Sequence, residues 1–294
     1  MRFLIFSILI NFFCITAYSQ NLDSILQSEE DTIPERTMVD ATFKTSRIVQ
    51  NHSIENPPKN EMYVSIAHRF GLISDGYYEL YGIDETSNIR IGFEYGISDR
   101  LAIGLGRSKF EKSYDGFLKY RIIRQQTGER NIPFSISVLI AATANTLKWE
   151  IPERNNLQES RFDYCYQLLL ASKLSKRISI QLMPGYIHRN LVKYRTDEND
   201  VYSLGIGGRI KITKRLSLNV DYTYLLSPEI AKTYKNPFAI GLDIETGGHI
   251  FQIIMSNSYG INDKSFITQT QNSWLKGNIH IGFTLFRLFS FGKK

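Results

Sequence analysis

Charged side chains recur at every second position in several segments of the chain. In the segment 88–98, for example, Arg90 and Glu94 alternate with isoleucine and aromatic residues. Residues two apart in an extended strand point to the same face, so these charges would share one surface. The charged residues at such positions, with one amide, are Arg90, Glu94, Lys119, Arg121, Arg161, Asp163, Gln167, Arg209, Lys211, Asp221 and Asp243. Their charges nearly balance, which allows two interpretations: ion pairs that brace an interior, or a lumen-lining polar surface for small solutes without strong charge selectivity.

Residues that could bind a metal or perform catalysis are scattered. The histidines that fall in patterned segments are His68, His188, His249 and His280. Each stands alone, so we expect no metal site. The glycine-rich stretches 104–106 and 205–208 do not open a helix after a strand, as a phosphate site requires. A hydrolase is the enzymatic alternative, because His188 lies close to Asp197, Glu198 and Asp200, but no nucleophile is evident. We therefore expect no enzyme activity and no cofactor.

The N-terminus has the features of a secretory signal. Arg2 precedes an apolar run over residues 3–15, and small residues occupy both cleavage subsites before Gln20. The sequence therefore predicts a signal peptide over residues 1–19, cleaved after Ser19.

The composition fits an ordered exported protein without disulfides. With 22% charged and 43% hydrophobic residues, the chain is not of the intrinsically disordered class. Removal of the signal peptide removes Cys14 and leaves Cys165 without an intrachain partner. The net charge of +6 is mild and scattered, which does not favour binding to nucleic acid.

The alternation that positions the charges is a β-strand pattern. In the segment 88–98 the odd positions are all apolar, and the even positions hold no large apolar side chain. From residue 61 onward the pattern recurs about twelve times. The predicted strands are 62–70, 88–97, 101–105, 116–125, 133–147, 161–171, 178–188, 202–212, 216–226, 238–245, 249–258 and 275–287. Pro184 lies inside one of them and cannot donate to a ladder, so we expect a bulge or local break there.

The connections between these strands alternate between short and long. Short turns fall at 98–100, 173–176, 213–214 and 247–248, and longer connections at 71–87, 107–115, 150–160, 189–200, 228–236 and 259–273. One connection in a short slot, 126–131, has intermediate length. Outer-membrane barrels have an even strand number, short periplasmic turns and long outer loops. The sequence therefore predicts an all-β fold: a transmembrane antiparallel up-and-down β-barrel of about twelve strands over 61–294, in the outer membrane with both termini periplasmic. A soluble β-sandwich is the alternative.

Residues 20–60 lack the alternation and form a polar N-terminal segment. With an even strand number this segment begins at the inner mouth of the barrel. Extended, it would reach on the order of 100 Å, several times the ~30 Å hydrocarbon thickness. We hypothesise that residues 42–60 lie in or against the lumen as a plug, with Arg47 and His52 as donors to inward acids such as Glu94 and Asp221. The alternative is a loose periplasmic tail.

Three stretches resemble a known family. They are IRIGFEYGISDRL at 89–101, YDGFLKY at 114–120 and GHIFQ at 248–252. They are similar to an uncharacterised family of Gram-negative outer-membrane β-barrel proteins, a porin-like domain of unknown function, over about Thr42 to Phe291. The resemblance implies fold and location only. The final strand also resembles the signal read by the barrel-assembly machinery, except that Gly292, Lys293 and Lys294 follow its terminal aromatic residue.

The function expected from these observations is passive passage or binding of small polar solutes. A non-conducting barrel that serves as scaffold or partner for a periplasmic or surface protein is the alternative, and an outer-membrane hydrolase is the second. The expected partners are outer-membrane lipid, the barrel-assembly machinery during insertion, and small solutes, with no nucleic acid.

Overall fold

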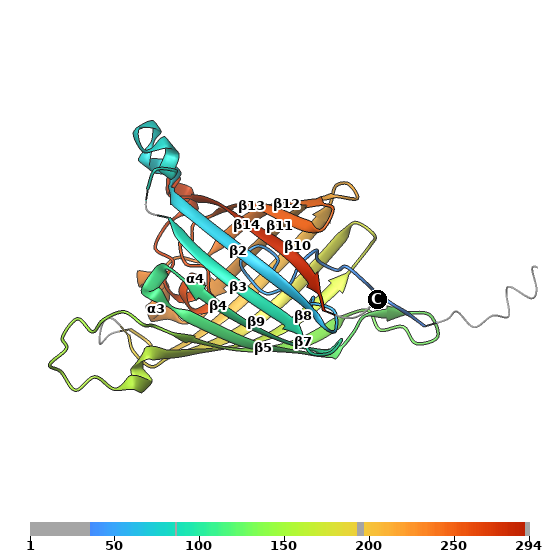
Figure 1. Ribbon diagram of the computed structural model, residues 1–294, viewed down its shortest axis with the longest axis horizontal. Helices are drawn as coiled ribbons and strands as arrows, with labels where there is room; N and C mark the ends of the chain where they lie inside the picture. The colour runs from blue at the N-terminus through green and yellow to red at the C-terminus, as the bar shows by residue number, and fades with distance from the viewer. Residues whose placement is uncertain (1–35, 86, 193–196, 292–294) are drawn as a thin grey trace, which may run out of the picture.

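The computed structural model describes residues 36–85, 87–192 and 197–291, which form a closed barrel (Figure 1). The predicted signal peptide and the three residues after Phe291 lie outside the described residues. Each strand pairs antiparallel with its neighbours, and β14 pairs with β2 to close the ring. The barrel strands are β2 (Glu61–Leu72), β3 (Asn88–Gly96), β4 (Leu101–Ser108), β5 (Tyr114–Ile123), β7 (Ser135–Ala144), β8 (Phe162–Lys173), β9 (Ile178–Arg189), β10 (Asp200–Lys211), β11 (Leu216–Leu225), β12 (Phe238–Thr246), β13 (His249–Ser256) and β14 (His280–Ser290). The predicted all-β antiparallel barrel is confirmed.

The alternation in the sequence is the alternation of faces in the structure. On β3, Ile89, Ile91 and Phe93 are 37–47% exposed on the outside, whereas Arg90 and Glu94 are buried inside. Inward glycines make room for inward side chains on neighbouring strands. A Cβ atom at Gly104 would lie 2.2 Å from the Phe117 ring. The outer band of apolar side chains is the surface that lipid covers in a membrane barrel.

The two ends of the barrel differ in their connections. One end, the short-turn end, carries the turns after β3, β8, β10 and β12. The start of β2 and the end of β14 also meet there, through a hydrogen bond from the Phe291 N–H to the Asn60 carbonyl. The opposite end, the long-loop end, carries η1 (Ile73–Asp75), η2 (Tyr77–Gly82), η3 (Phe110–Lys112), η4 (Gln158–Arg161), α3 (Pro228–Thr233), α4 (Asp263–Thr268) and η5 (Trp274–Lys276). No helix among the described residues is long and apolar enough to cross a membrane.

Three local features bear on the predictions made from the sequence. The connection after β5 is longer than the other short turns because it carries β6 (Gln126–Thr127), which pairs with β1 (Thr37–Met38). The last strand begins at His280 and not near residue 275, because η5 precedes it and ends at Gly277 with φ +72°. Pro184 introduces no bulge, because β9 keeps its register with β10 through this residue. The predicted local break does occur, since the pairing of β9 with β8 is interrupted opposite Leu168 and Leu169.

The facing of β10 leads to a prediction. Ile206 is 53% exposed on the outer face, midway along the strand. Replacing it with lysine should lower the free energy of unfolding in bilayers by about 2–4 kcal/mol, because a charge at mid-membrane depth loses its hydration. Ile212, just past the end of the same strand, is the matched control, since the cost falls toward the interface. Urea titration of the refolded variants measures both changes, and equal costs would contradict this placement of the membrane.

Candidate functional site in the barrel lumen

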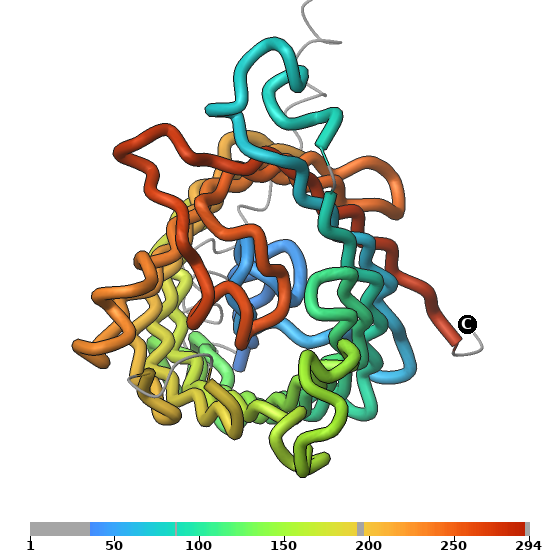
Figure 2. Tube along the Cα trace, turned by 90° about the vertical axis from the view of Figure 1, so that its left-hand side faces the viewer, coloured from blue at the N-terminus to red at the C-terminus, as the bar shows by residue number. Residues whose placement is uncertain are grey.

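The segment 42–58, here the inner loop, lies inside the barrel. Figure 2 views the molecule from the long-loop end and shows this segment (blue) surrounded by the strands. Between residues 42 and 54 every residue except Lys44 is buried. The loop turns back on itself at the Arg47–His52 bridge, with the Ser53 N–H donating to the Ser46 carbonyl at 2.8 Å. It therefore enters and leaves at the short-turn end.

An aspartate of the wall binds the tip of the inner loop. Asp221, on β11, directs one carboxylate oxygen at the turn. This oxygen accepts hydrogen bonds from the backbone N–H groups of Val49, Gln50 and Asn51 at 3.2, 2.8 and 3.0 Å. Such charge-assisted bonds are stronger than bonds between neutral groups. The sequence predicted Asp221 as an inward acid with Arg47 and His52 as donors. In the structure its donors here are backbone N–H groups of the inner loop, whereas Arg47 and His52 contact Asp263.

The inward cations of the wall bind backbone carbonyl groups of the same segment. Lys119 Nζ donates to the carbonyls of Ser53 and Glu55 at 3.0 and 2.5 Å. Arg121 donates to the Ile54 carbonyl at 3.0 Å. Arg209 donates to the Thr42 carbonyl at 3.3 Å. These cations thus satisfy carbonyl groups that would otherwise be buried without a partner.

Two glutamines attach the inner loop to further strands. Gln181, on β9, donates to the His52 carbonyl at 2.7 Å and accepts from the Ile54 N–H at 2.8 Å. Gln252, on β13, donates to the Ile48 carbonyl at 2.7 Å. The loop is therefore held from many sides by side chains.

A second segment enters the lumen from the long-loop end. Every residue of α4 is buried, and Asn262 caps the helix by accepting from the Ser265 N–H at 2.9 Å. Lys264 forms ion pairs with Glu111 at 2.8 Å and with Asp163 of the wall at 3.4 Å. The connection between β13 and β14 therefore folds inward.

The two inserted segments meet at Asp263. Its carboxylate contacts Arg47 Nη1 at 3.2 Å and His52 Nε2 at 3.2 Å. We call these three residues the interlock. All three are buried. The interlock joins a segment that entered at one end of the barrel to a segment that entered at the other.

Burial and charge set the protonation of the interlock, whose residues lie outside the strands. Burial, reinforced by the Arg47 charge, lowers the pKa of His52 to about 4. Burial alone would raise the pKa of the Asp263 carboxyl, but Arg47 and His52 beside it hold that pKa well below its usual range. At neutral pH the interlock is therefore a carboxylate paired with a guanidinium and hydrogen-bonded to a neutral imidazole.

The inner wall also carries apolar side chains. One cluster joins the inner loop to the wall and contains Phe43, Ile48, Val49, Ile54, Leu169, Ala171, Met183, Ala239 and Ile254. A second surrounds α4 and contains Phe117, Leu139, Ala141, Cys165, Ile187, Val201, Leu225, Ile230, Tyr234, Phe266 and Ile267. The lumen thus contains a packed core as well as a polar network.

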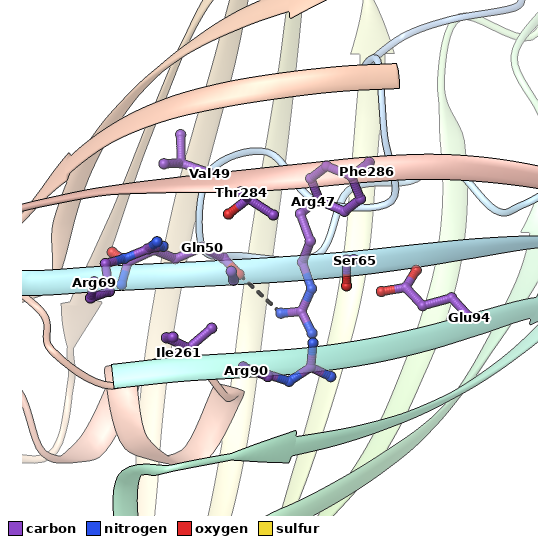
Figure 3. A pocket seen from close by; sticks show the side chains of 11 residues that line it. Arg47, Val49, Gln50, Ser65, Arg69, Arg90, Glu94, Ile261, Thr284 and Phe286 are labelled. Carbon is purple, nitrogen blue, oxygen red and sulfur yellow. Dashed lines mark hydrogen bonds between the residues drawn. The ribbon is translucent and has the colours of Figure 1, made fainter. Parts of the chain in front are cut away.

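Two cavities lie beside the inner loop. A cavity of about 20 Å³ is bordered by three arginines, Arg47, Arg69 and Arg90, and by Glu94 (Figure 3). It has room for about one water molecule. A larger cavity of about 300 Å³ borders the inner loop near Phe43 and Glu55, with Arg121 among its lining residues.

The remaining predicted lumen residues have different surroundings. Arg90 forms a two-bond ion pair with Asp115 at 2.9 and 2.5 Å, which braces two neighbouring regions of the wall. Asp243 accepts from Gln252 at 2.6 Å, and Gln167 is buried. Arg161 belongs to η4 and not to a strand, and its guanidinium lies 3.9 Å from the Trp149 ring centre. Lys211 is the last residue of β10 and is half-buried. These last two are not part of the group around the inner loop.

The surroundings of the candidate metal ligands and of His188 are as follows. In the described ranges, no three His, Cys, Asp or Glu side chains gather as a metal site would require. The His188 ring contacts Asp200 at 2.6 Å and Asn190 at 3.0 Å. Neither residue supplies a hydroxyl or thiol nucleophile.

Several residues of the site were not predicted from the sequence. Asp263 and Lys264 were placed in an outer loop, and the inward apolar residues were not singled out. A signal for the latter exists, because Leu139, Leu169 and Ile187 stand at positions of the alternation where a wet lumen favours polar or small residues. Large apolar residues on the inner face indicate that something packs against them.

Comparison with protein families identifies one match. A family model described as "Membrane bound beta barrel domain (DUF5777)" matches residues 43–289. No curated protein matches the chain.

Solved structures with some similarity include two porins and one enzyme. The NanC porin has a TM-score of 0.47 at 10% identity, over 79% of this chain and 100% of that one. The KdgM porin has a TM-score of 0.46 at 11% identity, over 78% and 99%. Outer membrane phospholipase A from Escherichia coli has a TM-score of 0.44 at 12% identity, over 79% and 90%.

Proposed function

This chain belongs to the family of membrane-bound β-barrel domains, and from that premise we propose that it is an outer-membrane barrel for passage or binding of small polar solutes, closed by its inner loop. The proposal divides the chain into a signal peptide at 1–19, a polar segment at 20–60 that supplies the plug, and a barrel at 61–294. Both termini are periplasmic in this proposal, and the barrel-assembly machinery inserts the protein.

One observation carries the proposal: side chains, and not strand pairing, hold the inner loop. Within residues 42–58 the bridge is internal, between Arg47 and His52. The contacts to the wall that we described are hydrogen bonds accepted by Asp221, hydrogen bonds donated by Lys119 and Arg121, those of the two glutamines, and apolar packing. Removing the loop would therefore break no rung of the barrel ladder.

Displacement of the inner loop would expose a lumen with charges of both signs. Lys119, Arg121 and Arg209 would lose their carbonyl partners, and Asp221 would lose its three N–H donors. Charges of both signs along a pore favour small polar or zwitterionic solutes over a strong preference for one ion. The cavity of about 300 Å³ near Phe43 and Glu55 is a candidate first binding place.

Conductance of the refolded protein in planar bilayers tests the proposal. We expect the full mature chain to be closed for most of the time. Deletion of residues 21–56 behind an intact signal peptide should raise conductance, while migration on gels stays heat-modifiable because the strands remain paired. A folded deletion variant that conducts no better than the full chain would contradict the proposal.

The apolar inner wall favours a second candidate, a non-conducting barrel that acts as scaffold for a periplasmic or surface protein. Leu139, Leu169 and Ile187 are fully buried behind α4 and the inner loop. Exposing them to water opposes opening, because each buried large apolar side chain contributes about 1.5–3 kcal/mol. The same conductance experiment separates the two candidates.

A further inference from the structure

The connection between β2 and β3 leaves the barrel sideways. It contains η1 and η2, and we call residues 73–83 the lateral loop. In Figure 1 it stands away from the barrel wall at the long-loop end, and in Figure 2 it lies outside the ring of strands. The β7–β8 connection differs, because in Figure 1 it continues beyond the ends of the strands at the long-loop end. The lateral loop is thus beside the barrel, where the outer edge of a bilayer lies.

The lateral loop exposes large apolar side chains. Tyr77 and Tyr78 are 80% and 83% exposed, and Leu80, Tyr81 and Ile83 are each 53% exposed. Exposed apolar side chains that are contiguous mark interaction surfaces, whereas single ones are ordinary. Tyrosine is a residue of the membrane–water interface, since its ring is apolar and its hydroxyl can remain hydrated.

The conformation of the lateral loop is held in place. The Tyr81 N–H donates to the Gly76 carbonyl at 2.7 Å, and Asp75 accepts from the Leu72 N–H at 3.0 Å. Leu80 and Tyr81 have φ angles of +45° and +56°, which cost free energy in residues with a side chain. The loop therefore maintains a strained turn that keeps its aromatic rings outside.

The surface of the lateral loop continues the lipid-facing band. On the strands that it connects, Ile66, Ile91 and Phe93 are 41–47% exposed on the outer face. The neighbouring β13–β14 connection, joined to the loop by a hydrogen bond from the Ile73 N–H to the Ile279 carbonyl, adds Leu275, which is 99% exposed. The apolar surface thus passes from the wall to the loop along the same side.

We propose that the lateral loop binds the surface of the lipid bilayer, with its tyrosines in the interfacial region of the leaflet at the long-loop end. Apolar side chains at such a surface enter the boundary between headgroups and acyl chains. This role requires the membrane location of the barrel but not solute passage.

Fluorescence quenching by brominated lipid tests the proposal. A nitrobenzoxadiazole probe is attached to Ser74→Cys in a Cys165→Ser chain, reconstituted in phosphatidylcholine bilayers with or without brominated acyl chains. We expect brominated lipid to lower the fluorescence at least about twofold, because the loop sits about 5–10 Å deep in the interface. The matched control is a probe at Asn155→Cys, on the exposed β7–β8 connection, where we expect no quenching.

Variants of the tyrosines separate lipid contact from loop folding. Tyr77→Ser with Tyr78→Ser should abolish the quenching of the probe at position 74, whereas Tyr77→Phe with Tyr78→Phe should retain it. Equal quenching at both probe positions, or no quenching at position 74, would overturn the proposal. Protection of the probe at position 74 by a bound protein in place of lipid would overturn it as well.

Discussion

Replacing Asp221 with alanine is expected to release the inner loop from the lumen while the barrel stays closed. The change removes the acceptor of three backbone N–H groups and leaves them buried without a partner. Each orphaned donor costs about 1–3 kcal/mol, so we expect docking of the inner loop to lose at least about 3 kcal/mol of free energy. That is a shift of at least roughly a hundredfold toward the released loop.

Labelling of a buried cysteine measures the release. Ser46, on the inner loop, is fully buried, and Ser46→Cys in a Cys165→Ser chain provides the reporter. A maleimide reagent should label this introduced thiol slowly in the parent and much faster with Asp221→Ala. Asp115→Asn is the matched control, since Asp115 pairs with the wall residue Arg90 and not with the inner loop. Fast labelling in the control, or slow labelling with Asp221→Ala, would contradict this account.

Replacing Asp263 with alanine is expected to loosen both inserted segments together. The Arg47 guanidinium would stay buried without its carboxylate, and breaking a buried pair in this way costs about 3–5 kcal/mol. Labelling should therefore increase at Ser46→Cys on the inner loop and also at Ser265→Cys on α4. Acceleration at only one of these positions would show that the segments do not depend on each other.

A double-mutant cycle isolates the contact itself. Arg47→Met alone should also accelerate labelling, because Asp263 then lacks its cation. In an Asp263→Ala chain the same Arg47→Met change should have little further effect, since contacting residues are not additive. Full additivity would contradict a direct interlock.

The sequence predicted the barrel strands better than the segments that fill the lumen, the inner loop and α4. The reason is physical. Lipid requires an apolar residue at each outward position, so Ile89 and Ile91 fix the register, and a slip by one residue would place Arg90 in lipid. The inward side has no such constraint. Lys119 and Arg121 were predicted to face inward, but their partners are backbone carbonyl groups of the inner loop. Every residue has such a group, so the sequence does not indicate which ones these cations bind.

The position of α4 was even less accessible to prediction. The length of the 259–273 connection predicts an outer loop, and loop length does not indicate whether the loop bends into the barrel or away from it. The deciding contacts join Asp263 to residues more than two hundred positions earlier. Arg161 was predicted incorrectly in another way. Its place in the alternation suggested a strand, whereas it lies in η4 just before β8 begins.

The path of the inner loop has a consequence for the order of assembly. The loop enters beside Ala41 and leaves beside Asn60, both at the short-turn end, and it precedes the first barrel strand in the chain. It can therefore dock as a hairpin after β14 has paired with β2, with no threading of the chain. Maturation would then have two kinetic phases: pairing of β14 with β2, followed by docking of the inner loop in the lumen. A newly closed barrel would be transiently hollow, and heat-modifiability on gels should appear before Ser46 becomes protected.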